Sequence, residues 1–559
     1  MMLKNPKKWE SILLFSAICW LLLLINMNAD TFFFRLDLTE EKRYTITDAT
    51  KGLLQNLDDE VYIEVYLEGE LNSGFKRLQK AIQEQLEGFK LYSNNQVVFK
   101  FINPNDAPTQ KARNQFYKQL VAKGLPATTI YEKTDGQNIQ KVIFPGAIIS
   151  YQNKEKAVLL LKGNKGASAA QQLNQSIEGL EYELASTIKT VTADKKKSIA
   201  FIQGHQELNS QELSDITTSL SETYIVDKVN LKQNKIATYD AIVVAQPKKK
   251  FSEQEKYQLD QFIMNGGSAI FLLDRVQMNL DSIGKGGTYA FGYELNIEDM
   301  LFKYGVRVNM DMIQDQQAGL IEIFAGYRGN QANIRKLPWP YFVYLNKFSS
   351  HPITRNMDVI LGKFISTIDT VKAVGIKKTP LVFTSQYSRI RKAPTMVDLN
   401  ELKNIRDIKL FNKKHIPVAY LLEGKFISLY NNRFPPKGVN TKNLKKKSKG
   451  AKVIVFSDGD IIRSEKDKKT GKQLPIDFDK ARGETISNKD FILNALAYLT
   501  EENGLITSRN RQVKLRPLDE FKVEEEKLYW QILNIVVPVF LIIAFGVMRS
   551  YRRKKKYQS

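Results

Sequence analysis

The stretch FSEQEKYQLDQFIMNGGSAIFLLD, residues 251–274, predicts a helix, a tight turn and a buried strand. Ser252 is a plausible N-cap, because its hydroxyl can accept a hydrogen bond from a free N–H of the first helical turn. Gly266 and Gly267 end the helix, since glycine readily takes the left-handed conformation found just beyond a helix. The following SAIFLLD is apolar on both faces, which is typical of a strand that helices cover on both sides of a parallel sheet.

Strands and helices alternate on both sides of this stretch. Strands are expected at 198–203, 224–229, 240–245 and 451–456, and helices at 210–222 and 489–499. This alternation predicts a parallel sheet with helices on both faces. Short alternating strands at about 336–430 predict a β-rich insertion, which we place on the rim of the sheet. We therefore expect one α/β domain over residues 197–505.

A second α/β unit is expected ahead of this domain, over residues 33–192. From Val61 the predicted order is strand, helix, strand, helix, two or three strands and a closing helix, with Leu78, Ile82, Leu86 and Phe89 on one helical face. This order is that of a thioredoxin-like α/β sandwich with a mixed sheet. The layout implies no redox chemistry, because Cys19 is the only cysteine of the chain.

An apolar run lies at each end of the chain, with positive charge on its outer side. The first occupies residues 12–28 behind a short tail, 1–11; the second occupies 530–548 and precedes the basic tail 549–559. Each run is about long enough to cross a bilayer, and the positive-inside rule places both tails in the cytoplasm. A cleaved signal peptide is the alternative for the first run, but no small-residue cleavage site follows it.

The two α/β units are therefore expected as an exported region between two terminal transmembrane helices. Residues 506–529 connect this region to the second span as a membrane-proximal linker.

The chain is strongly basic, with 83 Lys and Arg residues against 60 Asp and Glu residues and a net charge of +23. Part of this charge belongs to the two tails, which lie beside an anionic leaflet. The densest internal cluster is KNLKKKSK at residues 442–449. A solvated loop is the simpler interpretation, and a patch facing lipid headgroups or an acidic partner is the other. Because the cluster contains no aromatic residues that could stack on bases, we expect no nucleic-acid partner.

Polar residues follow the predicted strands at their carboxyl ends, where such sheets bind ligands. They are His205, Asp274, Arg275, Asp458 and Asp460, and we take them as a candidate surface for a ligand or partner. The carboxylates of SDGD could bind a divalent cation or act as acid and base, but a turn that closes the strand is the simpler interpretation. His205 could be a general base, yet no G-x-S-x-G elbow offers it a nucleophile.

No catalytic residue, cofactor site or metal site is predicted. The three histidines show no zinc-ligand spacing, and no G-x-x-x-x-G-K-[ST] motif is present. Any use of ATP is therefore expected to depend on a separate protein.

Several segments carry a family resemblance through their joint order. They are RLDLTEEKRYTIT at 35–47, the segment 240–274, IEDMLFKYGVRV at 297–308, HPIT at 351–354, TPLVFTSQYS at 379–388, VAYLLEGKFIS at 418–428, VIVFSDGDII at 453–462 and NKDFILNALAYL at 488–499. In this order they resemble the GldG family, the auxiliary subunits of gliding-motility-associated ABC transporters. The resemblance covers essentially the whole chain, and its motifs are structural rather than catalytic.

The resemblance implies a two-pass protein of the bacterial inner membrane with a large periplasmic region. It implies a separate permease subunit and a separate ATPase subunit as partners, in gliding motility and its associated secretion, with a homodimer within the complex as one option. It also implies a class I glutamine-amidotransferase-like, Rossmann-like fold for residues 197–505. The nucleophile of those enzymes is missing, because Asp274 and Arg275 follow SAIFLLD instead of a Gly-x-Cys-x-Gly elbow.

The role that follows is a non-enzymatic accessory subunit that binds a partner or ligand on a pseudoenzyme domain. Two alternatives stay open. One is an envelope hydrolase that uses Asp458, Asp460 and His205, and the other is a purely structural scaffold of the motility machinery.

Overall fold

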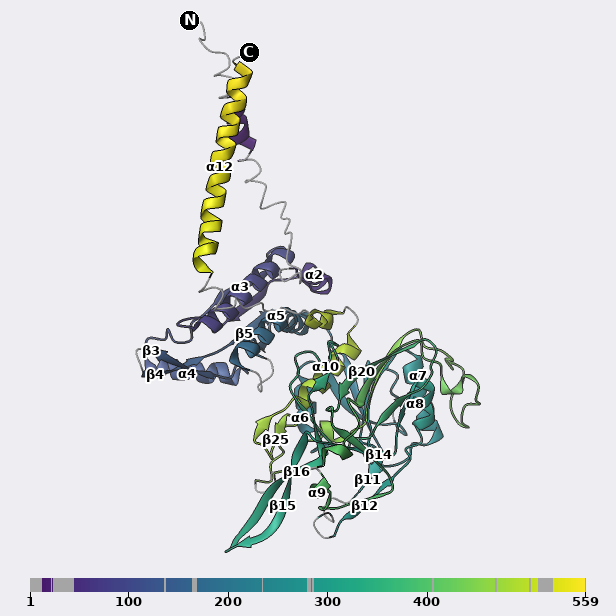
Figure 1. The fold of residues 1–559 in the computed structure, drawn as a ribbon. Coiled ribbons are helices and arrows are strands. Elements are labelled where there is room, and N and C mark those ends of the chain that lie inside the picture. Colours follow the sequence, from purple (N-terminus) through teal and green to yellow (C-terminus); the bar gives the residue numbers. More distant parts are fainter. Residues whose placement is uncertain are drawn as a thin grey trace. The chain divides into compact units, whose positions relative to one another are not determined.

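The structure is a computed structural model, and it divides the chain into two units, Met1–Arg511 and Gln512–Ser559. The residues that it describes are 13–21, 23, 45–134, 137–162, 168–233, 235–278, 283, 286–404, 407–467, 470–501, 504–510 and 526–557. Within the first unit, an N-terminal domain over residues 45–192 precedes a larger domain that begins at residue 198 (Figure 1).

The N-terminal domain is a four-stranded mixed sheet packed against helices. Its elements are α2 (Asp48–Gln55), β1 (Val61–Val65), α3 (Ser73–Tyr92), β2 (Val97–Phe101), α4 (Gln110–Ala122), β3 (Thr128–Thr134), β4 (Gln137–Ile143), β5 (Gly146–Tyr151), β6 (Lys154–Leu159) and α5 (Ala169–Thr192). The strand order is β2-β1-β5-β6; β1 and β2 are parallel and the other neighbours antiparallel, while β3 and β4 form a separate hairpin. The face predicted from Leu78, Ile82, Leu86 and Phe89 is buried in the core. The thioredoxin-like assignment stays a prediction.

The larger domain is built on one eight-stranded sheet. In the order in which they lie side by side, its strands are β17 (Lys347–Phe348), β20 (Ile376–Phe383), β23 (Pro417–Gly424), β24 (Ala451–Phe456), β10 (Ser268–Leu272), β9 (Ala241–Ala245), β7 (Ser198–Gln203) and β8 (Ile225–Asn230). From β24 to β8 all neighbours are parallel, and from β24 to β17 they are antiparallel. Every residue of β9 and β10 is buried.

Helices cover both faces of the sheet, as the alternation of elements predicts (Figure 1). On one face pack α6 (Ser214–Ser221) and α10 (Asn488–Thr500), whose apolar residues share a core with alternate residues of β7, β9 and β10. On the other face pack α7 (Glu253–Met264) and α8 (Glu298–Tyr304), which share a second core with the remaining residues of those strands. The helix predicted at 210–222 is shorter than expected, because it begins only at Ser214.

The stretch 251–274 forms the predicted helix, turn and strand. Ser252 caps α7 by accepting a hydrogen bond from the backbone N–H of Glu255 (3.3 Å), and the Ser252 N–H donates to the Glu255 carboxylate in return (2.8 Å). Gly266 has a φ of +96°, the left-handed conformation that favours glycine. β10 begins two residues later and enters the middle of the sheet.

The β-rich part of this domain differs from the predicted insertion in extent and in place. Its strands are β11 (Val276–Gln277), β12 (Thr288–Gly292), β13 (Val306–Val308), β14 (Asp311–Asp315), β15 (Ala318–Arg328), β16 (Gln331–Leu345), β18 (Ile360–Lys363), β19 (Ile368–Thr370), β21 (Ser388–Lys392) and β22 (Thr395–Val397). They form small sheets that begin well before residue 336. β20 and β23 extend the main sheet itself, because β20 pairs with β23 and β23 pairs with β24; Leu381 and Leu421 enter the same core as β9 and β10. β15 and β16 make a long projecting hairpin (Figure 1).

The C-terminal unit contains α12 (Lys527–Tyr557), which includes the predicted span 530–548. Among the described residues, Lys527–Lys555 is one helix that is long and apolar enough to cross a membrane. Of the predicted span 12–28, residues 13–21 and 23 are helical and the others lie outside the described residues. The two-pass topology therefore stays a prediction.

A buried carboxylate fixes α7 to its surroundings in the larger domain. Asp260 is fully buried and accepts hydrogen bonds from the Tyr304 hydroxyl (2.8 Å), the Ser428 hydroxyl (2.6 Å) and the Leu429 backbone N–H (2.9 Å). These donors belong to α8 and to the start of η3 (Leu429–Asn431), whose N-cap is Ser428. One side chain on α7 therefore satisfies polar groups from two other segments that are far apart in sequence.

We expect Asp260→Ala to lower the unfolding free energy by about 3 kcal/mol, because three buried donors lose their acceptor. Gln254→Ala, at an exposed position of the same helix, is the control and should change it by less than about 0.5 kcal/mol. Urea unfolding of the detergent-solubilised chain measures both. Equal midpoints for the two variants would contradict the role of Asp260.

Candidate functional site

Side chains at the carboxyl ends of β9, β10 and β24 meet around one amide group. Gln246, which follows β9, donates from Nε2 to Asp274 Oδ2 (2.5 Å) and to Asp460 Oδ1 (3.1 Å). Arg463 donates to Gln246 Oε1 and also pairs with Asp460 (Nη1 to Oδ1, 3.1 Å). The strands are parallel, so their first polar residues leave the sheet at one edge and can reach one another. We call these side chains, with Asp458, the strand-end junction.

The sequence SDGD closes β24 as a hydrogen-bonded turn. Asp458 is fully buried, and its carboxylate accepts from the backbone N–H groups of Asp460 (2.7 Å) and Lys363 (2.7 Å). The Gly459 N–H donates to Asp274 Oδ1 (2.6 Å). A Cβ at Gly459 would lie 2.5 Å from the Cβ of Gln246, so only glycine permits this approach of the turn to the end of β9.

The strand-end junction contains three carboxylates and one guanidinium in a largely buried place. Burial and the neighbouring Asp460 raise the pKa of Asp274 to about 7. Burial and the charges of Asp460 and Asp274 raise the pKa of Asp458 well above its usual value. The Arg463 guanidinium offsets part of this repulsion, because it lies against Asp460 and the Gln246 amide. The junction therefore keeps bound protons at pH values where exposed aspartates have lost them.

His205 contacts residues outside the strand-end junction. It is buried, its Nδ1 contacts Glu207 (3.0 Å), its Nε2 contacts Glu255 (3.1 Å), and its ring stacks on Phe251 with centroids 3.7 Å apart. Burial alone would lower the pKa of His205, but the hydrogen bonds to Glu207 and Glu255 raise it above its usual value. Because Glu255 also belongs to the capping box of α7, His205 fixes the end of β7 to the start of that helix.

Arg275 has a similarly local role. It is buried directly after Asp274 and pairs with Glu298 in the first turn of α8. Glu298 also accepts from the Leu295 N–H (2.6 Å). Burial would raise the pKa of Glu298, but the Leu295 N–H and the Arg275 guanidinium hold it below its usual value. Arg275 thus connects the end of β10 to α8.

The structure therefore brings together three of the five residues named from the sequence and separates the other two. Asp274, Asp458 and Asp460 meet in the junction, whereas His205 and Arg275 hold helices in place. The hydrolase alternative requires His205, Asp458 and Asp460 to converge on one pocket, yet both His205 nitrogens contact other carboxylates, those of Glu207 and Glu255. Within the described residues, no group of three or more His, Cys, Asp or Glu side chains is arranged to hold a metal ion.

The residues that complete the junction gave little signal in the sequence. Gln246 follows a predicted strand, so its position pointed to this edge, but an amide alone indicates no chemistry. Arg463 lies beyond the predicted turn. Lys363 contributes a backbone N–H from 95 residues before Asp458, a contact that no local pattern reveals.

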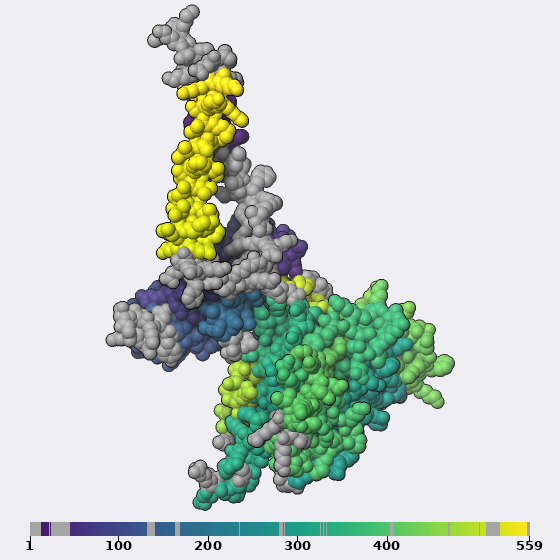
Figure 2. All heavy atoms as spheres, viewed as in Figure 1, coloured from purple at the N-terminus to yellow at the C-terminus, as the bar shows by residue number. Residues whose placement is uncertain are grey.

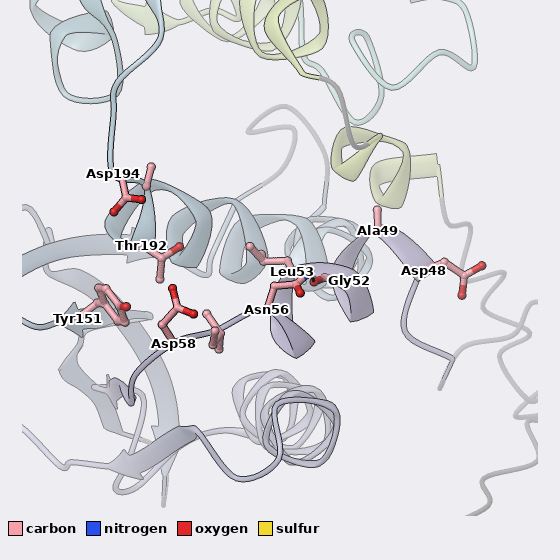
Figure 3. A pocket seen from close by; sticks show the side chains of 11 residues that line it. Asp48, Ala49, Gly52, Leu53, Asn56, Asp58, Tyr151, Thr192 and Asp194 are labelled. Carbon is pink, nitrogen blue, oxygen red and sulfur yellow. Dashed lines mark hydrogen bonds between the residues drawn. The ribbon is translucent and has the colours of Figure 1, made fainter.

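A cavity of about 670 Å³ lies elsewhere, in the N-terminal domain (Figure 3). It lies between α2, the end of β5 and the end of α5, and Tyr151, Asp58 and Thr192 gather at one side of it (Figure 3). Asp48 and Asp194 also line it, so its charged groups are all acidic. Burial and the charges of Asp58 and Asp194 raise the pKa of Tyr151. Such a lining disfavours anionic ligands and none of the five predicted residues belongs to it.

Comparison with known protein families identifies the family to which the chain belongs. A family model described as "ABC-type uncharacterized transport system" matches residues 196–495, the larger domain. A second model, "Domain of unknown function (DUF7088)", matches residues 40–150 of the N-terminal part. The first match spans more than half of the sequence. The chain therefore belongs to this auxiliary family of ABC-type transport systems.

Two further comparisons are more distant. An uncharacterized protein of Borreliella burgdorferi (strain B31) is 21% identical over 556 residues, which cover 96% of each chain. A solved structure titled "mmIFT52 N-terminal domain" covers 54% of this chain and 98% of its own at 13% identity, with a TM-score of 0.31 that supports no inference. The resemblance predicts an auxiliary subunit of an ABC transporter, and the family match confirms this part of the prediction. The predicted link to gliding motility stays a proposal.

We expect Gly459→Ala to destabilise the larger domain by about 1–3 kcal/mol, because the added methyl overlaps Gln246 and forces the turn away from β9. Gly450→Ala is the matched control, since a Cβ there meets no atom within 4 Å. Urea unfolding midpoints compare the two. A Gly459→Ala midpoint equal to that of Gly450→Ala would show that the close approach is unimportant.

The raised pKa of Asp274 predicts a pH dependence of stability. An unfolded aspartate ionises near pH 4, whereas the folded Asp274 ionises at about 7, so the folded state gains protons relative to the unfolded state between these values. Stability should therefore fall as the pH rises from about 4 to about 7. Asp274→Asn should flatten this fall, and the exposed-site control Asp227→Asn should keep it. Thermal unfolding across this pH range measures all three chains, and an unchanged slope for Asp274→Asn would be the contrary result.

Proposed function

We propose that the chain is a membrane-anchored accessory subunit of an ABC transporter, with two spans, cytoplasmic termini and a large periplasmic region. In this proposal it catalyses no reaction and binds a partner or ligand on its exported domains. It works with a separate permease subunit and a separate ATPase subunit in the inner membrane, in gliding motility and the associated secretion. The observation that carries the proposal is the family match over residues 196–495.

Two features of the chain support this role. The helix Lys527–Lys555 supplies an anchor of sufficient length. The sequence has no G-x-x-x-x-G-K-[ST] motif to cradle nucleotide phosphates, so a transporter that contains this chain needs its ATPase from elsewhere. The strand-end junction agrees with a non-catalytic role, because its polar groups are engaged with one another rather than presented to a substrate.

We also propose fold relationships for the two exported domains. The order β2-β1-β5-β6 supports a thioredoxin-like layout for the N-terminal domain. For the larger domain we propose an amidotransferase-like fold in which Asp274 and Arg275, just beyond the end of β10, stand where those enzymes carry their nucleophile elbow. Such a domain is a pseudoenzyme whose scaffold serves for binding.

Affinity purification of the tagged full chain from mild detergent tests the function. We expect an ABC permease and an ABC ATPase to be recovered with it. A chain in which residues 530–548 are replaced by an unrelated apolar span of equal length is the matched control, because it stays anchored but loses any specific helix contacts with a permease. Recovery of the chain with neither transporter subunit would favour the structural scaffold instead.

Reporter fusions at each terminus test the topology separately. Both termini should report a cytoplasmic location, since the positive charge lies outside each apolar run. A periplasmic signal at either end would overturn the two-pass arrangement while leaving the family membership in place.

A further inference from the structure

An exposed basic loop of the larger domain contains the dense run of lysines KNLKKKSK at residues 442–449. We call residues 432–450, NRFPPKGVNTKNLKKKSKG, the lysine loop; it contains six lysines, one arginine and no acidic residue. The six lysines are Lys437, Lys442, Lys445, Lys446, Lys447 and Lys449, and all are exposed. Figure 2 shows this part of the chain, in light green, projecting at the right of the body.

The backbone of the lysine loop is fastened to the body of the domain. The Lys445 N–H donates to Gln261 Oε1 (2.8 Å), and Gln261 Nε2 donates to the Lys445 carbonyl (3.1 Å). The Tyr257 hydroxyl donates to the Asn440 carbonyl (3.2 Å), and the Ser448 N–H donates to Phe426 (2.9 Å). Val439 and Leu444 pack against the core. These contacts hold the backbone of the loop against the domain, and the lysine side chains extend from it into solvent.

The charge on the loop is not neutralised within the described part of the chain. None of the six lysines has an Asp or Glu oxygen within 4.0 Å there, whereas Arg433 is paired with Asp299 (2.7 Å). Holding so many like charges close together is unfavourable unless counter-charge arrives from outside. The loop is thus built for an anionic surface that the chain itself does not supply.

An apolar side chain stands in the middle of this charge. Phe434 is 98% exposed, next to Pro435 and Pro436. Exposure of this apolar ring to water is unfavourable, but the ring can enter the boundary between headgroups and acyl chains while lysines contact the headgroups. An acidic protein segment would pair with the lysines but would give the Phe434 ring no apolar surroundings.

We propose that the lysine loop docks the larger domain onto the surface of an anionic bilayer. Lysines act as point charges and suit a diffuse layer of anionic headgroups, whereas recognition of defined carboxylates or phosphates favours the arginine fork. A single phenylalanine is also too little for the stacked bases of a nucleic acid. The candidate span Lys527–Lys555 is long and apolar enough to anchor the same chain in a bilayer. The proposal does not depend on a transporter partner.

Quenching by spin-labelled lipid tests this docking in the full chain. Cys19→Ser removes the only natural thiol, and Asn432→Cys places a fluorophore beside Phe434. In nanodiscs of phosphatidylcholine mixed with phosphatidylglycerol we expect strong quenching, and in phosphatidylcholine alone we expect little. Raising the salt from 0.1 M to 1 M shortens the screening length from about 10 Å to about 3 Å and should abolish the difference.

Two triple variants localise the effect. Lys445→Gln, Lys446→Gln and Lys447→Gln together should remove the quenching, since each lysine near an anionic surface changes the docked ratio about fivefold. Lys248→Gln, Lys249→Gln and Lys250→Gln make the same change of charge in another exposed run and should leave it intact. Phe434→Ser should weaken the quenching without removing its dependence on phosphatidylglycerol.

Three results would overturn the proposal. They are equal quenching in both kinds of nanodisc, equal effects of the two triple variants, and binding of polyglutamate at the labelled loop in nanodiscs that show no quenching. The last of these would assign the loop to an acidic protein partner. The comparison of lipids and salt uses the natural loop, so it stands even where a triple variant fails to fold.

Discussion

Burial of β9 and β10 on both faces is the constraint on which the larger domain depends. Each strand contributes alternate residues to two separate cores, and apart from Ser268 at the start of β10 all of their side chains are apolar. The other polar side chains of this part of the sheet therefore lie beyond the ends of the strands. Burying such groups without partners is costly, and at these ends they are engaged with one another.

The strand-end junction follows from this displacement. Gln246 can accept from Arg463 and donate to Asp274 and Asp460, so a neutral amide links groups whose charges do not balance. Gly459 allows the turn to approach Gln246 closely, and the Asp458 carboxylate accepts hydrogen bonds from two backbone N–H groups. The turn that is the simpler interpretation of SDGD in the sequence is present in the structure, where it also ties β24 to the end of β10 through the Gly459 N–H and Asp274.

The parts of the fold that depend on local pattern could be predicted from the sequence. Ser252, Gly266 and the apolar run after it define a helix, a turn and a strand without outside information, and the buried face of α3 follows from its spacing. The place of β20 and β23 could not be predicted, because joining the main sheet depends on the free edge of β24.

The candidate site follows the same division. Position after a strand identified Asp274, Asp458 and Asp460, whereas the partners of His205 come from Glu207, two residues away, and Glu255, fifty residues away on another element. Only the assembled sheet distinguishes a histidine that clamps a helix from one that serves as a base.

A domain whose strand-end polar groups are bound to one another has little chemistry to offer at the edge where related sheets hold ligands. Surfaces that the fold leaves unsatisfied are then the better places for contacts with other molecules. The lysine loop is one, since its six lysines have no Asp or Glu partner within the described chain. The β15–β16 hairpin is of the same kind, since Phe324 and Tyr327 are exposed near its tip. Both belong to segments that interrupt the alternation of parallel strands and helices. The regular sheet thus provides a rigid base, and its insertions provide the surfaces for binding.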